Sequence, residues 1–272
     1  MRLAELYNLA HARLWSEKSG YDIFCSQIKR AVKILNNPKL EKIDTVMIDE
    51  YISKLEKTKS HMGTYLTNST INRNLSVLHK LLDYAYKREY LQKMPHFSWK
   101  TENPHRVRWL TDKEENDLIN ALEQIPFNRP GDEQTVAAVK VLLDTGMRRS
   151  ELLGLTNENI DGEWIRLWKT KNGKPRSIPL TSRSKELLTE HVPFTIAEHR
   201  LNRRWNKARK QLGLENDPQF VLHTLRHSCA TRLLKKTKNI AMVQKMLGHA
   251  KINTTLRYAH IDDDDLLNAV NS

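Results

Sequence analysis

Apolar residues recur at intervals of three and four along most of this 272-residue chain, and this periodicity limits its fold more than any other feature. Such spacing places them on one face of a helix. In the first third of the chain the pattern predicts helices over residues 3–14, 23–35, 44–57 and 68–86. Asn36, Asn37 and Pro38 end the second of these, because proline cannot continue a helix. The sequence therefore predicts a compact four-helix domain over residues 1–93.

The helical pattern breaks over residues 94–109, which we interpret as a linker. Residues 94–104 carry Pro95 and Pro104 and show no periodicity. A new helix is predicted directly afterwards, because Thr111 is followed three residues later by Glu114, the spacing of a capping box. A second domain over residues 110–260 follows from this restart.

One stretch of this second domain predicts β-structure. Apolar residues over 164–168 and 177–180 flank the turn Lys171-Asn172-Gly173-Lys174, as in an antiparallel hairpin. Trp164 and Trp168 are expected mostly in the core. The predicted fold class is thus mainly α, with a helical domain and a mixed α+β domain that holds a small antiparallel sheet.

The chain is basic, and both domains share the excess of positive charge. Lys and Arg number 45 against 32 Asp and Glu, a net charge of +13. This balance favours a polyanionic partner, because Lys and Arg release condensed counterions when they meet phosphates. A generally basic surface without a ligand is the alternative. The two cysteines form no disulfide or zinc framework, and no apolar run spans a bilayer or resembles a signal peptide, so a cytoplasmic protein without membrane contact is expected.

Four short motifs of the second domain stand out by their chemistry. They are TGMRRSEL at 145–152, the hairpin lysine Lys171, HTLRH at 223–227, and LGH at 247–249 followed nine residues later by Tyr258. Arg148 and Arg226 carry planar guanidinium groups that can hold a phosphate bidentately. His223 lies three residues before Arg226, so the two share a helix face. Taken singly, each motif is ordinary.

Together, and in this order, the motifs resemble the tyrosine recombinase (phage integrase) family, whose pattern is TGxRxxEL, a hairpin lysine, HxLRH, LGH and a tyrosine about nine residues on. The resemblance is close over residues 105–260 and covers the first domain only as architecture. Ser228 stands where the family often has Thr. The resemblance implies a two-domain clamp around duplex DNA, with residues 1–93 as core-binding domain and 110–260 as catalytic domain.

The resemblance also implies how the site would hold a scissile phosphate. Arg148 and Arg226 would clamp its non-bridging oxygens and oppose the charge of the transition state. His249 would donate a further hydrogen bond to the phosphate. Glu151 would orient the groups that bind the phosphate and would not itself contact the DNA.

The remaining implied roles concern the covalent step. Tyr258 would attack phosphorus to give a 3′-phosphotyrosyl link, His223 would assist proton transfer, and Lys171 would protonate the departing 5′ oxygen. Lys171 is favoured over Lys174 because the family's lysine precedes the turn glycine. No metal or cofactor is needed, since the positive groups replace the metal. A zinc pair of His223 and His227 is disfavoured by the cation between them, and His227 is expected to be a packed helper.

Basic residues at helical spacing are the candidates for DNA backbone contact, with a solvated helix face as the alternative. These candidates are Lys29, Arg30, Lys33, Arg73, Lys80, Lys87, Arg200, Arg203, Arg204 and Lys207. Arg149, one position after Arg148, is expected to pack or to contact the DNA backbone.

The resemblance implies site-specific recombination, for integration, excision or resolution of DNA, by a recombinase of the chromosome-resolution or the mobile-element type. Double-stranded core sites, a homotetramer on two synapsed duplexes, and accessory DNA-bending or directionality proteins are the implied partners, in a bacterial or phage-encoded, nucleoid-associated setting. A type IB topoisomerase-like relaxase and a non-catalytic DNA-binding regulator are the alternatives. An additional arm-binding domain, which many phage integrases carry, is not expected within residues 1–105. The acidic run 262–265 should face away from DNA, and the tail 261–272 should dock on a neighbouring protomer.

Overall fold

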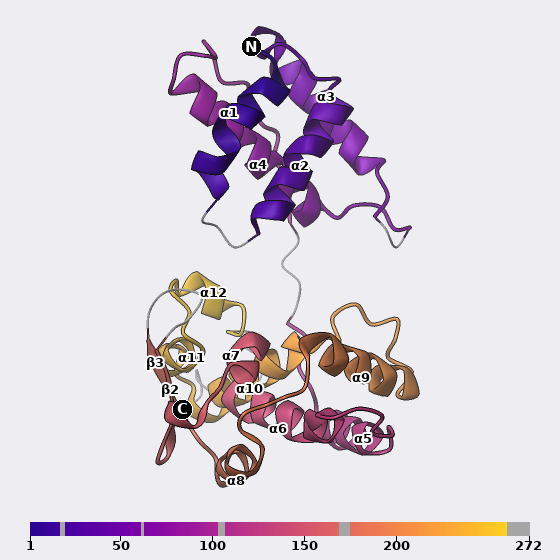
Figure 1. Cartoon of the computed structure of the whole chain (residues 1–272), viewed down its shortest axis with the longest axis vertical. Helices are drawn as coiled ribbons and strands as arrows, with labels where there is room; N and C mark the ends of the chain where they lie inside the picture. Colours follow the sequence, from indigo (N-terminus) through magenta and orange to yellow (C-terminus); the bar gives the residue numbers. More distant parts are fainter. Residues whose placement is uncertain (17–19, 61–62, 103–106, 169–174, 260–272) are drawn as a thin grey trace, which may run out of the picture. The chain divides into compact units, whose positions relative to one another are not determined.

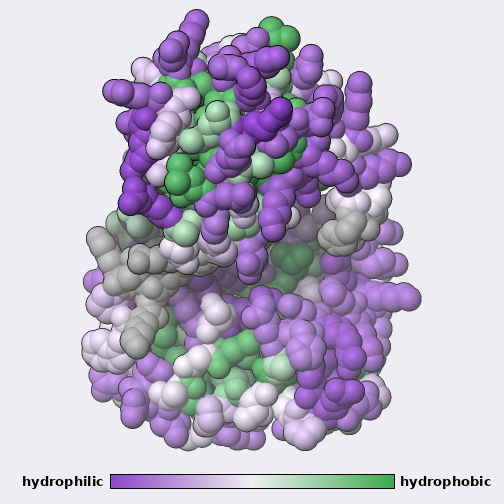
Figure 2. Space-filling model, turned by 45° about the horizontal axis from the view of Figure 1, so that its top comes forward, coloured by the Kyte–Doolittle hydropathy of each residue, from purple (hydrophilic) through white to green (hydrophobic). Residues whose placement is uncertain are grey.

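The computed structural model describes residues 1–16, 20–60, 63–102, 107–168 and 175–259. The chain forms two compact units, Met1–Pro104 and His105–Ser272, and each has its own apolar core (Figure 1). Figure 2 shows a surface on which hydrophilic residues predominate and hydrophobic residues form only scattered patches. Within the described ranges, no helix combines the length and the apolar character needed to cross a membrane.

The first unit is helical, as its sequence predicts. Its elements are α1 (Leu3–Trp15), α2 (Tyr21–Ile34), the 3-10 helix η1 (Leu40–Lys42), α3 (Thr45–Glu56) and α4 (Asn68–Tyr86). The long α4 packs against each of the other three α-helices, because its apolar residues form a wide stripe that includes Ile71, Leu75 and Leu78. Its N-terminus is capped by the side chain of Thr67, which accepts a hydrogen bond from the backbone of Thr70.

Residues 94–102, predicted as linker, contain no helix or strand but pack on this first unit. Phe97 is buried, with its ring edge-on to His79 and stacked against Trp99. Ser98 donates a hydrogen bond to Asp49, and the backbone N–H of Lys100 donates to an amide oxygen of α4. Burial of the aromatic ring and hydrogen bonds of the backbone hold residues 94–102 in place. Neither interaction requires a periodic sequence pattern, so this packing could not be predicted from the sequence.

The second unit is larger and mixed. Its elements are α5 (Asp112–Glu123), η2 (Asp132–Gln134), α6 (Thr135–Thr145), α7 (Arg149–Leu153), η3 (Asn157–Asn159), β1 (Ile160–Asp161), β2 (Trp164–Leu167), β3 (Arg176–Pro179), α8 (Ser182–His191), α9 (Glu198–Gln211), α10 (His223–Thr237), α11 (Ile240–Leu247) and α12 (Asn253–Leu256). The predicted capping box of Thr111 and Glu114 opens α5. The apolar α6 packs against α5, α8 and α10, so it forms the centre of this core.

The three strands form one antiparallel sheet in the order β1-β2-β3, with Ile165 opposite Ile178. The short β1 was not predicted. Trp164 and Trp168 are 41% and 66% exposed, so the prediction that they lie mostly in the core is wrong. Side chains alternate across a strand, and Ile165 and Leu167 take the inner positions of β2. The predicted turn at 171–174 lies outside the described residues.

Candidate active site

The TGMR segment makes a sharp turn between α6 and α7 that positions Arg148. Gly146 ends α6 in the left-handed region at φ +60°. A Cβ at this position would lie 2.9 Å from Leu247 Cδ2 and 3.0 Å from Cys229 Sγ, so only glycine fits. Arg148 follows as the N-cap residue of α7.

Glu151 holds two arginines at once. Its carboxylate accepts hydrogen bonds from the backbone N–H of Arg148 (2.7 Å) and from Arg148 Nη1 (2.9 Å). Arg176, the first residue of β3, donates to both carboxylate oxygens from Nη1 (2.8 Å) and Nη2 (2.6 Å). Burial alone would raise the pKa of Glu151, but the hydrogen bonds from Arg176 and Arg148 outweigh it and lower that pKa to about 2.

Arg226 connects two helix ends from its place on α10. Its Nη1 donates to the carbonyl oxygen of Gly146 (2.6 Å) and its Nη2 to that of Leu247 (2.7 Å). Burial, followed by the charges of Arg148 and Arg176, lowers the pKa of Arg226 to about 10. Among the described residues, the guanidinium groups of Arg148, Arg176 and Arg226 outweigh the carboxylate of Glu151, and this net positive charge suits an anion.

Tyr258 is buried just after α12, and its hydroxyl oxygen lies 2.8 Å from His227 Nδ1. Burial raises the pKa of Tyr258, opposed by the positive charges of Arg226 and Arg257. Burial and the neighbouring His223 lower the pKa of His227 to about 3. A neutral imidazole results at neutral pH, and its unprotonated nitrogen can accept a hydrogen bond from the phenol.

His249 is positioned by the C-terminus of α11. Gly248 adopts φ +67°, and the backbone N–H of His249 donates to the carbonyl oxygen of Gln244. The ring Nδ1 lies 2.9 Å from Thr255 Oγ1, so Nε2 is the ring nitrogen that can reach a ligand. Burial, Arg226 and Arg148 lower the pKa of His249 to about 4.

His223 begins α10 and has an exposed side chain. Its ring meets the ring of His227 edge to face, with centroids 4.7 Å apart. Partial burial and the charges of Arg226 and Arg148 lower its pKa. The structure therefore gathers six of the predicted residues in one place: Arg148, Glu151, His223, Arg226, His249 and Tyr258. Lys171 lies outside the described residues.

Sequence reasoning missed two residues of this cluster. His227, expected to be a packed helper, contacts the hydroxyl of Tyr258 directly. Arg176 was passed over although it lies two residues before the buried Ile178, and alternation along a strand places such a pair on one face. That spacing is the signal that could have found Arg176. Among the residues that the structure describes, no group of three or more His, Cys, Asp or Glu side chains is arranged to hold a metal ion.

Two of the predicted DNA contacts face the protein interior. Arg204 is buried, and its guanidinium donates to the carbonyl oxygens of Ile125 and Pro126. Arg200 forms an ion pair with the buried Asp132 and donates to the carbonyl oxygen of Pro130. Both guanidinium groups are used to satisfy interior acceptors, so we withdraw these residues as DNA contacts.

The other basic residues predicted to contact DNA differ in how far their side chains are exposed. Lys80 donates to the carbonyl oxygen of Leu14 and lies over the ring of Trp15, while Lys87 pairs with Asp83. Arg30 is half-buried. The exposed candidates are Lys29, Lys33, Arg73, Lys87, Arg203 and Lys207.

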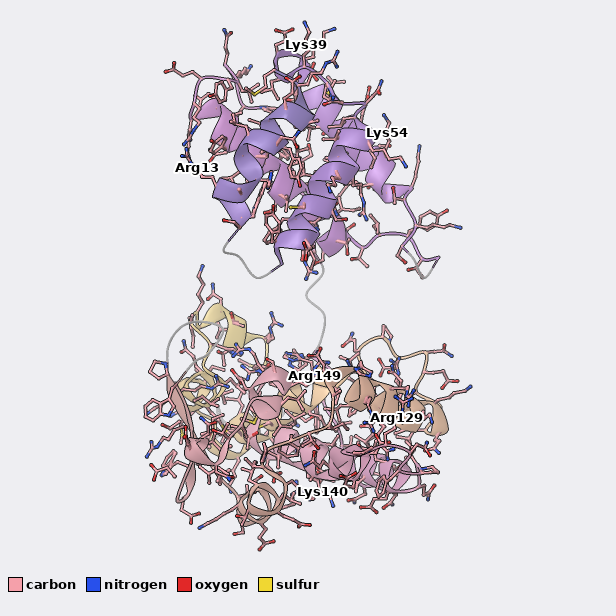
Figure 3. The ribbon with its side chains drawn as sticks, viewed as in Figure 1. Arg13, Lys39, Lys54, Arg129, Lys140 and Arg149 are labelled. Carbon is pink, nitrogen blue, oxygen red and sulfur yellow. The ribbon has the colours of Figure 1, made fainter. Side chains whose placement is uncertain are left out.

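Arg149 packs within the second unit, where Figure 3 marks it on α7. Its guanidinium forms an ion pair with Glu198 and donates to Asn202 Oδ1 (2.6 Å), both on α9. Of the two expectations for this residue, packing or DNA contact, the structure supports packing.

Two family models match the chain, one in each of its units. The family model described as Phage integrase family matches residues 108–195 and 195–265, and that of the phage integrase N-terminal SAM-like domain matches residues 8–89. Tyrosine recombinase XerA of Saccharolobus solfataricus is 38% identical over 140 residues, 48% of this chain and 47% of that protein. A tyrosine recombinase of Pseudothermotoga lettingae is 28% identical over 88% of this chain and 85% of its own length.

Solved structures share the fold. A lambda integrase dimer bound to a core site has a TM-score of 0.77 at 21% identity, over 96% of this chain and 98% of that one. The Tn1549 transposon integrase in complex with circular intermediate DNA has a TM-score of 0.75 at 19% identity, over 99% of both chains.

Fold and site together define a tyrosine-type site-specific DNA recombinase, and the matching relatives are named recombinases and integrases. The chain belongs to the phage integrase family. The family prediction is thereby confirmed, and neither the topoisomerase-like relaxase nor the non-catalytic regulator is favoured.

Proposed function

We propose that this recombinase cuts and rejoins DNA at core sites through a 3′-phosphotyrosyl intermediate, with Tyr258 as the nucleophile. The observation that carries the proposal is the position of Tyr258. Its hydroxyl contacts His227 in a pocket where, in the part of the chain that the structure describes, arginines outnumber carboxylates. A phenol so placed would meet a phosphodiester whose charge the pocket attracts.

The scissile phosphate would be held by Arg148, Arg226 and His249. Negative charge grows on the non-bridging oxygens as the fifth ligand of phosphorus forms, and fixed donors aimed at those oxygens stabilise that state most. Arg148 is fixed by Glu151, and Arg226 is fixed by two backbone carbonyls. Neither guanidinium would have to reorganise when the reaction occurs.

The covalent step exchanges one phosphoester for another. The phenolic oxygen of Tyr258 forms a bond to phosphorus while the bond from phosphorus to the 5′ oxygen breaks. The phenolic proton passes to the neutral histidine pair, where His227 is in contact and His223 lies against it. Lys171 would return a proton to the 5′ oxygen. Because the link keeps the ester bond, rejoining needs neither ATP nor a metal.

The first unit, Met1–Pro104, would bind the core site together with the catalytic unit, so that the two form a clamp on the DNA. Exposed Lys29, Lys33 and Arg73 are candidates for its backbone contacts. Basic side chains surround this unit: Arg13, Lys39 and Lys54 project from different sides in Figure 3. Charge alone therefore does not select its DNA-facing side.

Assembly completes the proposal. Four protomers would synapse two duplexes in the cytoplasm of a bacterial host, with accessory DNA-bending or directionality proteins. The tail 261–272, which includes the acidic run 262–265 and lies outside the described residues, would dock on a neighbouring protomer. Integration, excision or resolution of DNA, in a chromosome or a mobile element, would be the outcome.

A nicked suicide substrate tests the chemistry. Loss of the short fragment beside the nick traps the covalent adduct, which migrates slowly on a denaturing gel. Wild type should form the adduct on its own attachment DNA, and Tyr258→Phe should bind that DNA equally but form none. An adduct that persists in Tyr258→Phe would contradict the assignment, as would a wild type that neither cleaves this DNA nor relaxes a supercoiled plasmid that carries it.

A further inference from the structure

Arg176 is an arginine at the centre of the site for which the reaction outlined above has no use. It opens β3, and its side chain is only 8% exposed. Both of its terminal nitrogens donate to Glu151, whose side chain is 7% exposed. The same carboxylate holds Arg148. One buried group thus joins the sheet to the N-terminus of α7.

A further guanidinium with little exposure is costly in this place. Desolvation of a cation is unfavourable, and Arg148 and Arg226 already contribute positive charge nearby. Arg204, also buried, donates to backbone carbonyls and pairs with Asp132, so its contacts are with structural groups of the interior. Arg176 donates instead to Glu151, the carboxylate that also holds Arg148, so its position points to the chemistry of the site.

The charge balance shows what Arg176 does. Without it, Glu151 and Arg148 would form an isolated ion pair, and the carboxylate would cancel the charge of Arg148 where the phosphate must bind. With it, Arg176 supplies the counter-charge for Glu151. Two donors from Arg176 also occupy both carboxylate oxygens, so Glu151 holds the side chain of Arg148 through one nitrogen, Nη1, rather than through a bidentate pair.

A second contact links Arg176 to the turn that carries His249. A Cβ at Gly248 would lie 2.7 Å from Arg176 Cδ and 3.1 Å from its Nε. The residue before this glycine, Leu247, supplies the carbonyl that fixes Arg226, and the residue after it is His249. The stem of Arg176 therefore packs against the backbone between two phosphate-binding groups.

We propose that Arg176 is a positioning residue for strand cleavage: it neutralises Glu151, so that the charge of Arg148 stays available to the scissile phosphate. This inference rests on the proposed function. Arg176 itself does not touch the reacting atoms.

The test compares Arg176→Gln with Arg166→Gln, which removes the same charge from the neighbouring strand, where Arg166 is 34% exposed and paired with the exposed Asp161. Cleavage of the suicide substrate is measured in a single turnover with excess protein, and DNA affinity is measured by gel shift. We expect Arg176→Gln to cleave about 100-fold more slowly, with an affinity within about threefold of wild type. Arg166→Gln should match wild type in both, and equal cleavage rates for the two variants would overturn the proposal.

A merely structural role is separated by changing the substrate. A methylphosphonate at the scissile position replaces one non-bridging oxygen by a methyl group and removes the negative charge. An uncharged phosphonate depends less on the positive charge of Arg148, so the cleavage rate of Arg176→Gln should be less than about tenfold below that of wild type on this substrate. A defect of the same size on both substrates would assign Arg176 to folding only.

A double variant tests the route through the carboxylate. If Arg176 acts through Glu151, the variant with both Arg176→Gln and Glu151→Gln should cleave no more slowly than the slower single variant. Multiplied defects would refute that route. If Arg176→Gln unfolds, Arg176→Lys keeps the counter-charge for Glu151 and loses only the bidentate contact, so it should bind DNA normally and cleave within about tenfold of the wild-type rate. A folded Arg176→Lys that cleaves about 100-fold more slowly than wild type would overturn the proposal.

These outcomes are distinct from failure of the proposed function. That function fails if Tyr258→Phe still forms the adduct. The inference alone fails if wild type cleaves through Tyr258 and Arg176→Gln behaves as Arg166→Gln does.

Discussion

Replacement of Gly248 by alanine tests the packing of the site against a matched control. Gly248 and Gly213 both adopt left-handed φ, +67° and +68°, directly at or after the end of a helix. An added Cβ at Gly213 meets no atom within 4 Å, whereas at Gly248 it meets the side chain of Arg176 at 2.7 Å. The two substitutions thus share the backbone strain and differ in the steric clash.

The magnitudes follow from these two terms. Left-handed backbone costs an alanine about 1–2 kcal/mol, which both variants should lose. Arg176 cannot move aside without leaving Glu151, so Gly248→Ala should lose a further amount of about 1–3 kcal/mol from overpacking. Cleavage of the suicide substrate should also slow in Gly248→Ala and stay unchanged in Gly213→Ala.

Denaturant unfolding, followed by circular dichroism, gives the loss of stability for each variant, and hydrogen exchange of peptides from α11 localises it. Equal destabilisation of both variants, within about 0.5 kcal/mol, would refute the account of Arg176 as fixed in place.

Three further predictions concern separate groups. The pKa of Glu151 is lowered to about 2, so its ionised carboxylate contributes stability above about pH 4.5, and this contribution is lost as the pH falls through 2. The difference in free energy of unfolding between wild type and Glu151→Gln should therefore shrink over this pH range in acid denaturation. A constant difference would contradict the prediction. His227→Ala should slow single-turnover cleavage by about 10- to 100-fold because the phenol of Tyr258 loses its acceptor, while the exposed His199→Ala should cleave normally; equal rates would exclude the contact from catalysis. Arg204→Ala should cost about 3 kcal/mol in denaturant unfolding and Arg203→Ala almost nothing; equal losses would show that the burial of Arg204 is unimportant.

Helices and motif residues could be predicted because each leaves a local signal. The stripe of Ile71, Leu75 and Leu78 has the period of the helix that it forms, and Thr111 with Glu114 has the spacing of the cap. Arg148 and Tyr258 could be predicted because each belongs to a short motif that is recognised from neighbouring residues of the sequence.

Other features depend on contacts between distant segments, which no local pattern contains. Arg176 meets Glu151 across 25 positions, and His227 meets Tyr258 across 31. Phe97 is buried by packing on α4 although its own segment has no period. Arg204 shows the same limit: its helical spacing with Arg200 resembles a solvated or DNA-facing stripe, and only tertiary structure reveals the interior carbonyls.

The chemistry of the trapped adduct tests the central claim most directly. Protease digestion of the covalent complex, followed by mass spectrometry, identifies the amino acid attached to DNA, and end-labelling of the released strand identifies its terminus. We predict a peptide that carries a nucleotide 3′-phosphate on Tyr258, together with a released strand that bears a free 5′ hydroxyl. Attachment at any other residue, or through a 5′-phosphate, would contradict the account.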